Sequence, residues 1–486
     1  MATQHRTSFE IESIELKSER LAKTPELRSI VTDLEIFEHI QKPYLTARML
    51  LVDDSNFYQE ADIFGSEKII IKIKSTEDGS KPITKTFFID HIEKQQKIHD
   101  NAQVMSIHLV EDIVYISCLK NINRHYSGKP SEIIKKIART FLSKQVFSTG
   151  GINANFVQDE ENPNDTFADD AVQTDFTDQQ NIRCIIPNLH PIEALQWLTA
   201  RASTVKGYPF YMYSTLIDSH FILEDLGAIL LKESLNLGND AKFVASSTKA
   251  STMDVASQRR IIKNHEFSPG SENLLQIIEN GLVSADYEYI DTLTENTRKF
   301  KYNSKKDLFQ KLIDDNILSR DQPGQPGQPN PGIHFGEKID GKSFDEHTTN
   351  YITKIGGSNV FRTQPEIGNI DWTNSYGETK NAAEYKLKVV KASMDAMVKK
   401  NPVTINVDGI EFLKGDFNKT IGNNIDVIFL ATLNESTLAN EVIDKKKSGK
   451  YLIYSARHMF KQTVEKYDIA LNLIKIGNLK KGNRNE

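Results

Sequence analysis

The stretch GKYLIYSARHMFKQTVEKYDIALNLIKIG, residues 449 to 477, decides the fold of this chain. Its residues alternate between two faces from Tyr451 to Phe460 and again from Ile469 to Ile476, with a polar segment in between. Alternation with a period of two, in a segment rich in tyrosine and isoleucine, is typical of half-buried strands. The stretch therefore predicts a long antiparallel hairpin.

A second stretch, TFFIDHIEKQQKIHDNAQVMSIHLV at residues 86 to 110, has the same pattern. His91 and His458 both stand late in the first predicted strand. We interpret the two stretches as an internal duplication of a β-barrel unit. The alternative is that two unrelated hairpins resemble each other by convergence, because alternation is a common pattern. The matched segments are Phe87–Ile89 with Tyr451–Ile453 and Val104–Leu109 with Asp468–Leu473.

The composition is that of an ordinary globular chain, and its 486 residues suggest about three domains. A net charge of −6 argues against a dedicated nucleic-acid binder, which usually has a basic surface. The chain has no apolar run of about 18 residues, and its start lacks a secretory pattern, so we expect no membrane span and no cleaved leader. Two cysteines, Cys118 and Cys184, favour a reducing compartment.

The predicted fold class is α+β and mainly β, with two similar antiparallel β-barrel tube domains and a helix-containing domain between them. Residues 1–26 are expected to form a polar arm, and 1–120 the first tube-like domain. Residues 121–206 form the intermediate domain, because Pro130–Lys144 and His190–Ser203 carry apolar residues at helical spacing after a proline.

The second tube-like domain is expected to comprise residues 207–240 and 383–480. It begins with a hairpin of Tyr208–Thr215 and His220–Leu226. Residues 241–382 are predicted to be an insertion. Within it, DQPGQPGQPNPG at 321–332 is a Pro/Gly linker, which we interpret as an extended spacer.

Catalytic motifs are missing from the sequence, which has no nucleophile elbow, phosphate-binding loop or HExxH pair. The strand histidines His91, His108 and His458 are expected to be packed or hydrogen-bonded. The carboxylate pairs Asp53–Asp54 and Asp169–Asp170 are expected by chance among 66 acidic residues. We predict that the chain is not an enzyme, with no catalytic, cofactor-binding or metal-binding residue and no cofactor.

The acidic segment Gln158–Gln180 was considered as a calcium site. It lacks the central glycine and the ligand spacing of an EF-hand loop, so we predict a solvated loop.

Three stretches, in order along the chain, resemble the baseplate hub proteins of contractile-tailed phages. The third also resembles the hub part of type VI secretion spike proteins. They are DLEIFEHIQKPYLTARMLLVDDSNFYQEADIFGSEKIIIKI at 33–73, IPNLHPIEALQWLTARASTVKGYPFYMYS at 186–214, and KSGKYLIYSARHMFKQTVEKYDIALNLIKIG at 447–477.

This resemblance implies a homotrimer that joins a hexameric tail tube to a trimeric central spike. Two tube domains in each of three chains would give a pseudo-sixfold ring, whose bore passes the tape-measure protein and then DNA without specific binding. Further implied partners are tube or tube-initiator proteins and baseplate wedge proteins. The implied location is the virion tail baseplate, where a late protein assembled in the host cytoplasm would act in genome ejection.

Two alternatives remain open at the level of sequence. One is the hub of a headless contractile injection or type VI-like system, which would share the architecture. The other is a glycan-binding or cell-wall-processing protein built on β-domains.

Overall fold

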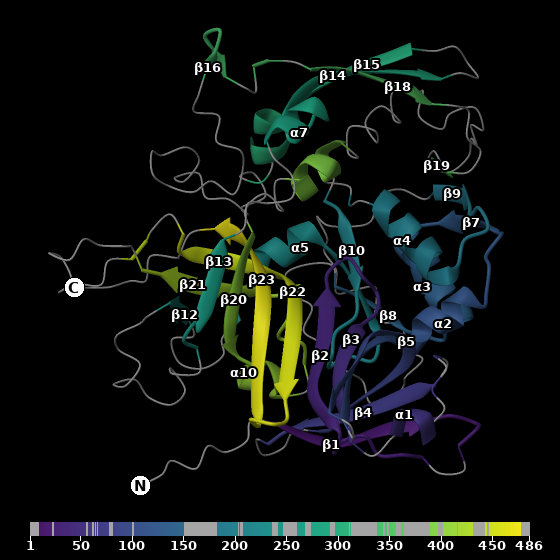
Figure 1. Ribbon diagram of the computed structural model, residues 1–486. Coiled ribbons are helices and arrows are strands. Elements are labelled where there is room, and N and C mark those ends of the chain that lie inside the picture. The colour runs from purple at the N-terminus through teal and green to yellow at the C-terminus, as the bar shows by residue number, and fades with distance from the viewer. Residues whose placement is uncertain are drawn as a thin grey trace, which may run out of the picture.

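The computed structural model has a mainly β fold, with antiparallel sheets and short helices, as the sequence predicts. The N-terminal and C-terminal strands lie side by side, and helices α2 (Asp112–Cys118), α3 (Pro130–Leu142) and α4 (Pro191–Arg201) lie to one side of them (Figure 1). The structure describes residues 9–21, 24–54, 57–60, 63, 65, 67–76, 81–99, 102–149, 182–202, 204, 208–235, 242–245, 260–267, 274–291, 297–310, 312, 338–343, 346–347, 349–355, 361–363, 389–396, 402–415, 417–430, 443–444 and 447–477.

The first unit contains six strands in the order β1-β4-β5-β6-β3-β2 and one short helix, α1 (Phe57–Glu60). Each neighbouring pair is antiparallel, and alternate side chains enter a common apolar core. The strands are β1 (Phe9–Lys17), β2 (Val31–His39), β3 (Thr46–Asp53), β4 (Lys68–Ser75), β5 (Ile83–His99) and β6 (Ala102–Glu111).

The prediction of a polar arm at residues 1–26 is wrong for β1. This strand pairs with β4 and buries Phe9, Ile11, Ile14 and Leu16. An irregularity between Ile11 and Ser13 shifts the alternation by one residue. Because the apolar residues change phase there, the sequence does not show a simple period of two.

The second unit has the strand order β12-β21-β22-β23-β20-β13, with α10 (Ile410–Leu413) after β20. Read strand by strand, this order is that of the first unit, with β12 in the place of β1 and β13 in the place of β2. One pairing differs, because β12 runs parallel to β21. The strands are β12 (Lys242–Ala245), β13 (Asn264–Phe267), β20 (Pro402–Asp408), β21 (Asn424–Phe429), β22 (Gly449–Lys461) and β23 (Lys466–Gly477).

The two hairpins also agree residue by residue. Ile89 pairs with Leu109 in the first unit, and Ile453 pairs with Leu473 in the second. Immediately after this pair, both β5 and β22 skip one residue in the register. Convergence on alternation would not require the same irregularity at the same place, so the internal duplication is confirmed.

The same pairing shows that His91 and His458, both late in their strands, do not occupy equivalent positions. His458 pairs with Ile469, and the residue at that position of the first hairpin is Met105, whose partner is Gln95. A second irregularity in β5, between Ile92 and Lys94, shifts the rest of β5 by one further residue relative to β22. The counterpart of His458 is therefore Gln95.

The middle of the chain combines three helices with two small sheets. Both predicted helices are confirmed, and so is the hairpin that follows them. The helices are α2 (Asp112–Cys118), α3 (Pro130–Leu142) and α4 (Pro191–Arg201), and the sheets are β10 (Phe210–Tyr213)-β11 (Phe221–Asp225)-β8 (Val146–Thr149) and β19 (Phe361–Thr363)-β9 (Ile182–Ile185)-β7 (His125–Gly128).

The segment predicted as an insertion contributes β12 and β13 to the second unit. It also forms the sheet β15-β14-β18 above the two units (Figure 1). The domain limits themselves stay a prediction, and the linker 321–332 and the segment 158–180 lie outside the described residues. The remaining elements are α5 (Leu226–Leu231), α7 (Leu274–Glu279), β14 (Ser284–Asp291), β15 (Thr297–Asn303), a π-helical turn (Lys305–Phe309), β16 (Lys338–Ile339), β17 (Lys342–Ser343) and β18 (Thr349–Ile355).

Candidate functional site at the seam between the units

The two units meet where β2 of the first pairs with β22 of the second, a junction we call the seam. The first part of β22 pairs with β21 inside its own unit, and the part from Ser455 to Lys461 pairs with β2. Asp33 lies opposite Lys461 and His39 opposite Ser455. The antiparallel seam makes one continuous sheet of both units, so backbone hydrogen bonds fix their relative positions.

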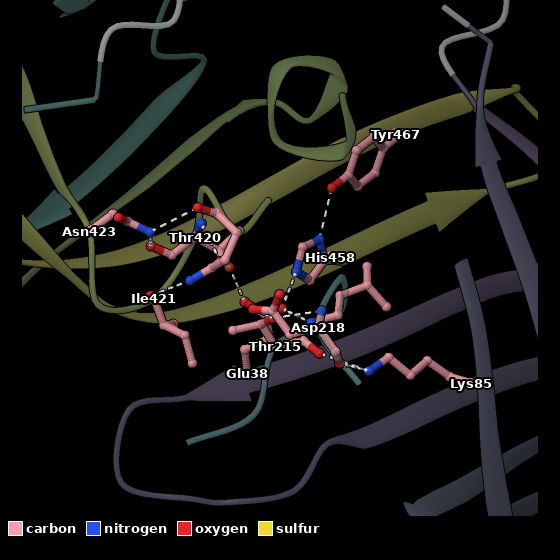
Figure 2. A network of polar contacts seen from close by, with 11 residues as sticks. Glu38, Lys85, Thr215, Asp218, Thr420, Ile421, Asn423, His458 and Tyr467 are labelled. Atoms are coloured by element: carbon pink, nitrogen blue, oxygen red, sulfur yellow. Dashed lines mark hydrogen bonds and ion pairs between the residues drawn. The ribbon is translucent and has the colours of Figure 1, made fainter. Parts of the chain in front are cut away.

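Glu38 lies on the core-facing side of the seam and is 2% exposed. Its carboxylate accepts hydrogen bonds from the backbone N–H of Leu216 and from the hydroxyl of Thr420. Nε2 of His458 lies 3.3 Å from Oε1 of Glu38 (Figure 2). Burial raises the pKa of a carboxyl group, but the charge of His458 and these hydrogen bonds outweigh burial, so the pKa of Glu38 is lowered.

His458 is fully enclosed between Glu38 and Tyr467. Its Nδ1 lies 2.8 Å from the hydroxyl of Tyr467. Burial raises the pKa of Tyr467 well above its usual range, so this hydroxyl keeps its proton. The two ring nitrogens of His458 thus face the Tyr467 hydroxyl on one side and the Glu38 carboxylate on the other.

Lys85 reaches the same place from β5. Its Nζ donates to the backbone carbonyl of Thr215 at 2.9 Å and to that of Asp218. Both carbonyls belong to the loop between β10 and β11, which also supplies the N–H of Leu216 to Glu38 (Figure 2). Burial lowers the pKa of Lys85. The network thus joins both units and the middle of the chain at one buried point.

The opposite face of the seam is open and polar. Arg457 of β22 forms an ion pair with Glu35 of β2, and its guanidinium lies 5.7 Å from the ring centroid of Phe37. This pair links the two units across the surface of the sheet. Because Arg457 is 44% exposed, solvent and salt weaken the ion pair.

A hollow with a volume of about 540 Å³ lies between α4, β10 and residues 391–395. Lys391 donates from Nζ to the carbonyls of Thr199, Ala200 and Ala202. The hydroxyl of Tyr211 donates to Asp395. Lys391, Tyr211 and Asp395 are therefore engaged with the protein itself.

The histidines considered from sequence are packed or hydrogen-bonded, as predicted. His91 and His108 stack with ring centroids 4.6 Å apart and have carboxylate neighbours in Asp90 and Glu93. His458 lies in the other unit, inside the seam. The structure therefore does not bring the three histidines together.

The carboxylate pair Asp53–Asp54 has a structural explanation. Asp53 is buried and accepts hydrogen bonds from the backbone N–H groups of Phe57 and Tyr58, at the start of α1. Asp169–Asp170 lie outside the described residues. Among the residues that the structure describes, no group of three His, Cys, Asp or Glu side chains is placed to hold a metal ion. None of the described helices is long and apolar enough to cross a membrane.

Sequence reasoning missed the residues of the seam network. A signal was present, because Glu38 follows Leu34 and Ile36 in the buried phase of β2. Lys85 likewise shares a face with Phe87 and Ile89, both of which are buried. A charged residue in the apolar phase of a strand indicates a buried polar contact, but it does not name the partner.

No family model and no curated protein matches this chain. Its solved structural neighbours are phage tail proteins and type VI secretion proteins. A tail protein from Neisseria meningitidis has 10% sequence identity and a TM-score of 0.47, covering 96% of this chain and 97% of its own. The 43 kDa tail protein of prophage MuSo2 from Shewanella oneidensis has 10% identity and a TM-score of 0.46, covering 96% and 98%. The E. coli c3393 protein, a type VI secretion component, has 7% identity and a TM-score of 0.38, covering 96% and 78%.

Proposed function

We propose that this chain is a structural hub of a contractile tail, a homotrimer that joins a hexameric tail tube to a trimeric spike. The observation that carries the proposal is the duplication within one continuous sheet. The two units share a strand order and a register irregularity, and the β2–β22 seam fixes their relation.

The duplication would let a trimer match a hexameric partner. Three chains with two similar units each present six similar positions to a hexameric partner, while the parts outside the repeats occur three times. A ring that closes also covers exposed strand edges and cannot extend into a filament. A trimer of this chain could therefore match sixfold on one side and threefold on the other.

A structural role, rather than catalysis, is supported by the buried polar groups. Glu38, His458 and Lys85 contact protein groups on all sides and hold three parts of the chain together. The net charge of −6 suits a bore through which DNA slides without sticking, since phosphate contacts require Lys and Arg. Tape-measure, tube-initiator and wedge proteins are the further partners of such a hub, and the virion baseplate is its location.

Light scattering on a sizing column, with negative-stain images of the same peak, tests the proposal. We expect a mass of three chains of 55.1 kDa each and a ring with a central hole. A monomer that persists at high concentration without rings would contradict it. Capsid genes beside this one would separate a phage hub from the hub of a headless injection system, which has the same architecture.

A further inference from the structure

The duplication gives each chain two sets of strands that could form a seam, and only one set is paired within the chain. In the seam, β2 of the first unit pairs with the second part of β22. The counterparts of these two strands are β13 and the second part of β5. They lie far apart along the sheet, with β6, β3, β2, β22, β23 and β20 between them. A single chain therefore cannot repeat the seam with its own strands (Figure 1).

We infer that β13 of one chain pairs with the second part of β5 of the next chain, forming a second seam between subunits. This inference rests on the proposed trimer and names its interface. Alternating the two seams gives a ring of six units, three joined within chains and three joined between chains.

The edge of β5 is available for this pairing. β4 follows β5 only as far as Phe88, and within the described part of the chain the remaining length of β5 pairs with strand β6 alone. Side chains from Glu93 to Ile98 are exposed, and Ile98 is 52% exposed. An edge strand that extends beyond its neighbour is a template for another strand.

β13 offers the complementary edge. It pairs with β20, and all four of its residues are exposed. Phe267 is 38% exposed and packs against Phe429 at the margin of the core, whereas its counterpart Ile36 is fully buried at the seam. A strand laid along β13 would cover Phe267 as β22 covers Ile36.

The seam within the chain fixes the register of the second one. Ile36 lies opposite His458, and Leu34 lies opposite Phe460. The counterparts place Phe267 opposite Gln95 and His265 opposite Lys97.

Charge agrees with this register. The ion pair of Glu35 with Arg457 spans the open face of the seam. Their counterparts are Glu266 on β13 and Lys94 on β5, which have the same signs in the same order. Opposite charges across strands stabilise pairing, while two like charges would oppose it. The second seam has Gln95 in the place of His458, so it lacks the imidazole that faces Glu38 in the first.

A disulfide tests the register directly. In a Cys118→Ser background, which removes the exposed thiol, we would combine Lys97→Cys with His265→Cys and oxidise the purified protein. We expect covalent dimers and trimers that disappear on reduction, because directly opposed residues meet disulfide geometry. The matched control pairs His265→Cys with Gln96→Cys, whose side chain points to the other face of the sheet, and it should stay uncrosslinked.

The outcomes separate this inference from the proposed function. A trimer by mass that crosslinks in neither pair, or equally in both, overturns the second seam and leaves the hub intact. A monomer by mass overturns both.

A charge reversal gives an independent measurement. Lys94→Glu should weaken trimer association several-fold, and adding Glu266→Lys should restore it. If the double variant is as weak as the single one, Lys94 and Glu266 do not face each other.

Discussion

The two repeats follow one strand order, yet they differ in how their strands are supplied. In the first unit β2, β3 and β4 follow closely in sequence, and each is eight or nine residues long. In the second unit the counterpart of β2 is a four-residue strand, separated from β20 by residues 268–401. The comparison shows that the pairing survives a long insertion between two neighbouring strands. Loop-closure entropy grows only slowly with length, so such an insertion costs little.

The repeats also differ in what covers their outer strands, β2 and β13. The first unit has its outer strand β2 covered by the second unit, and Glu38 and His458 are buried there. The second unit ends at β13, whose four residues are exposed. One repeat is therefore covered within the chain, and we infer that a neighbouring chain covers the other.

The largest expected effect comes from removing the buried contacts of Glu38 at the seam. Glu38→Ala would leave His458, Thr420 and the N–H of Leu216 buried without their partner, so we expect a loss of about 3–5 kcal/mol of unfolding free energy. Urea denaturation followed by circular dichroism measures this loss.

Glu35→Ala is the matched control, on the same strand but on the open face. It removes an ion pair whose arginine is 44% exposed, and it should cost about 1 kcal/mol, less than the loss of Glu38. Equal losses for Glu35→Ala and Glu38→Ala would contradict a buried role for Glu38.

Equivalent core positions should respond alike. Met49 and Ile405 occupy the same place in β3 and β20 and are both fully buried. Met49→Ala and Ile405→Ala should each cost about 2–5 kcal/mol, because each opens a cavity in a packed core. Denaturation curves of both variants test this, with Arg48→Ala and Thr404→Ala as neighbours on the opposite face. A large loss in one unit and none in the other would argue that the repeats are not built alike.

Two buried carboxyl groups should have opposite pH dependences. The pKa of Glu38 is lowered, so its stabilising contribution is present above the unfolded value near 4.5 and is lost as pH falls through the folded pKa. Burial raises the pKa of Asp225 to about 7, so its contribution is complete below 3.8 and is lost as pH rises through about 7.

Unfolding free energies measured from acid pH to pH 8 would therefore diverge in two different ranges. Relative to the parent protein, Glu38→Gln should become less stable as pH rises toward the unfolded value near 4.5, and Asp225→Asn should become more stable as pH rises from 3.8 to about 7. For Asp225→Asn the change should reach a few kcal/mol at most. Parallel changes in the two variants would show that the carboxyl groups are not held as described.

The smallest effect is expected from the linker in the insertion. Removing residues 321–332 should change the unfolding free energy by about 0.5 kcal/mol or less and leave the oligomer mass unchanged, since a spacer adds little but loop length. Dissociation of the oligomer on deletion would give the linker a role in assembly.

The sequence revealed the elements that are long and regular. The hairpins of β5-β6 and β22-β23 and the helices α3 and α4 have strong periodicity, and they were predicted within a few residues. Short strands were missed, because β12 and β13 contain only four residues each and β1 is interrupted by an irregularity. Their positions are set by pairing partners far away in the chain, which local patterns do not contain.

The seam was missed for a similar reason. A strand that pairs with one partner along its first half and another along its second half looks in sequence like any long strand. Glu38 and Lys85 were visible as charged residues in an apolar phase, but their partners come from three separate segments of the chain. Only the folded arrangement joins them.

The most direct test of the account is the symmetry of the particle seen along its axis. Class averages of end-on views from electron microscopy, together with mass in solution, would count its repeats. The account predicts three chains that form a ring of six similar lobes, with true threefold symmetry. A particle of three lobes, or one without a central hole, would contradict the claim that each chain contributes two equivalent units to one ring.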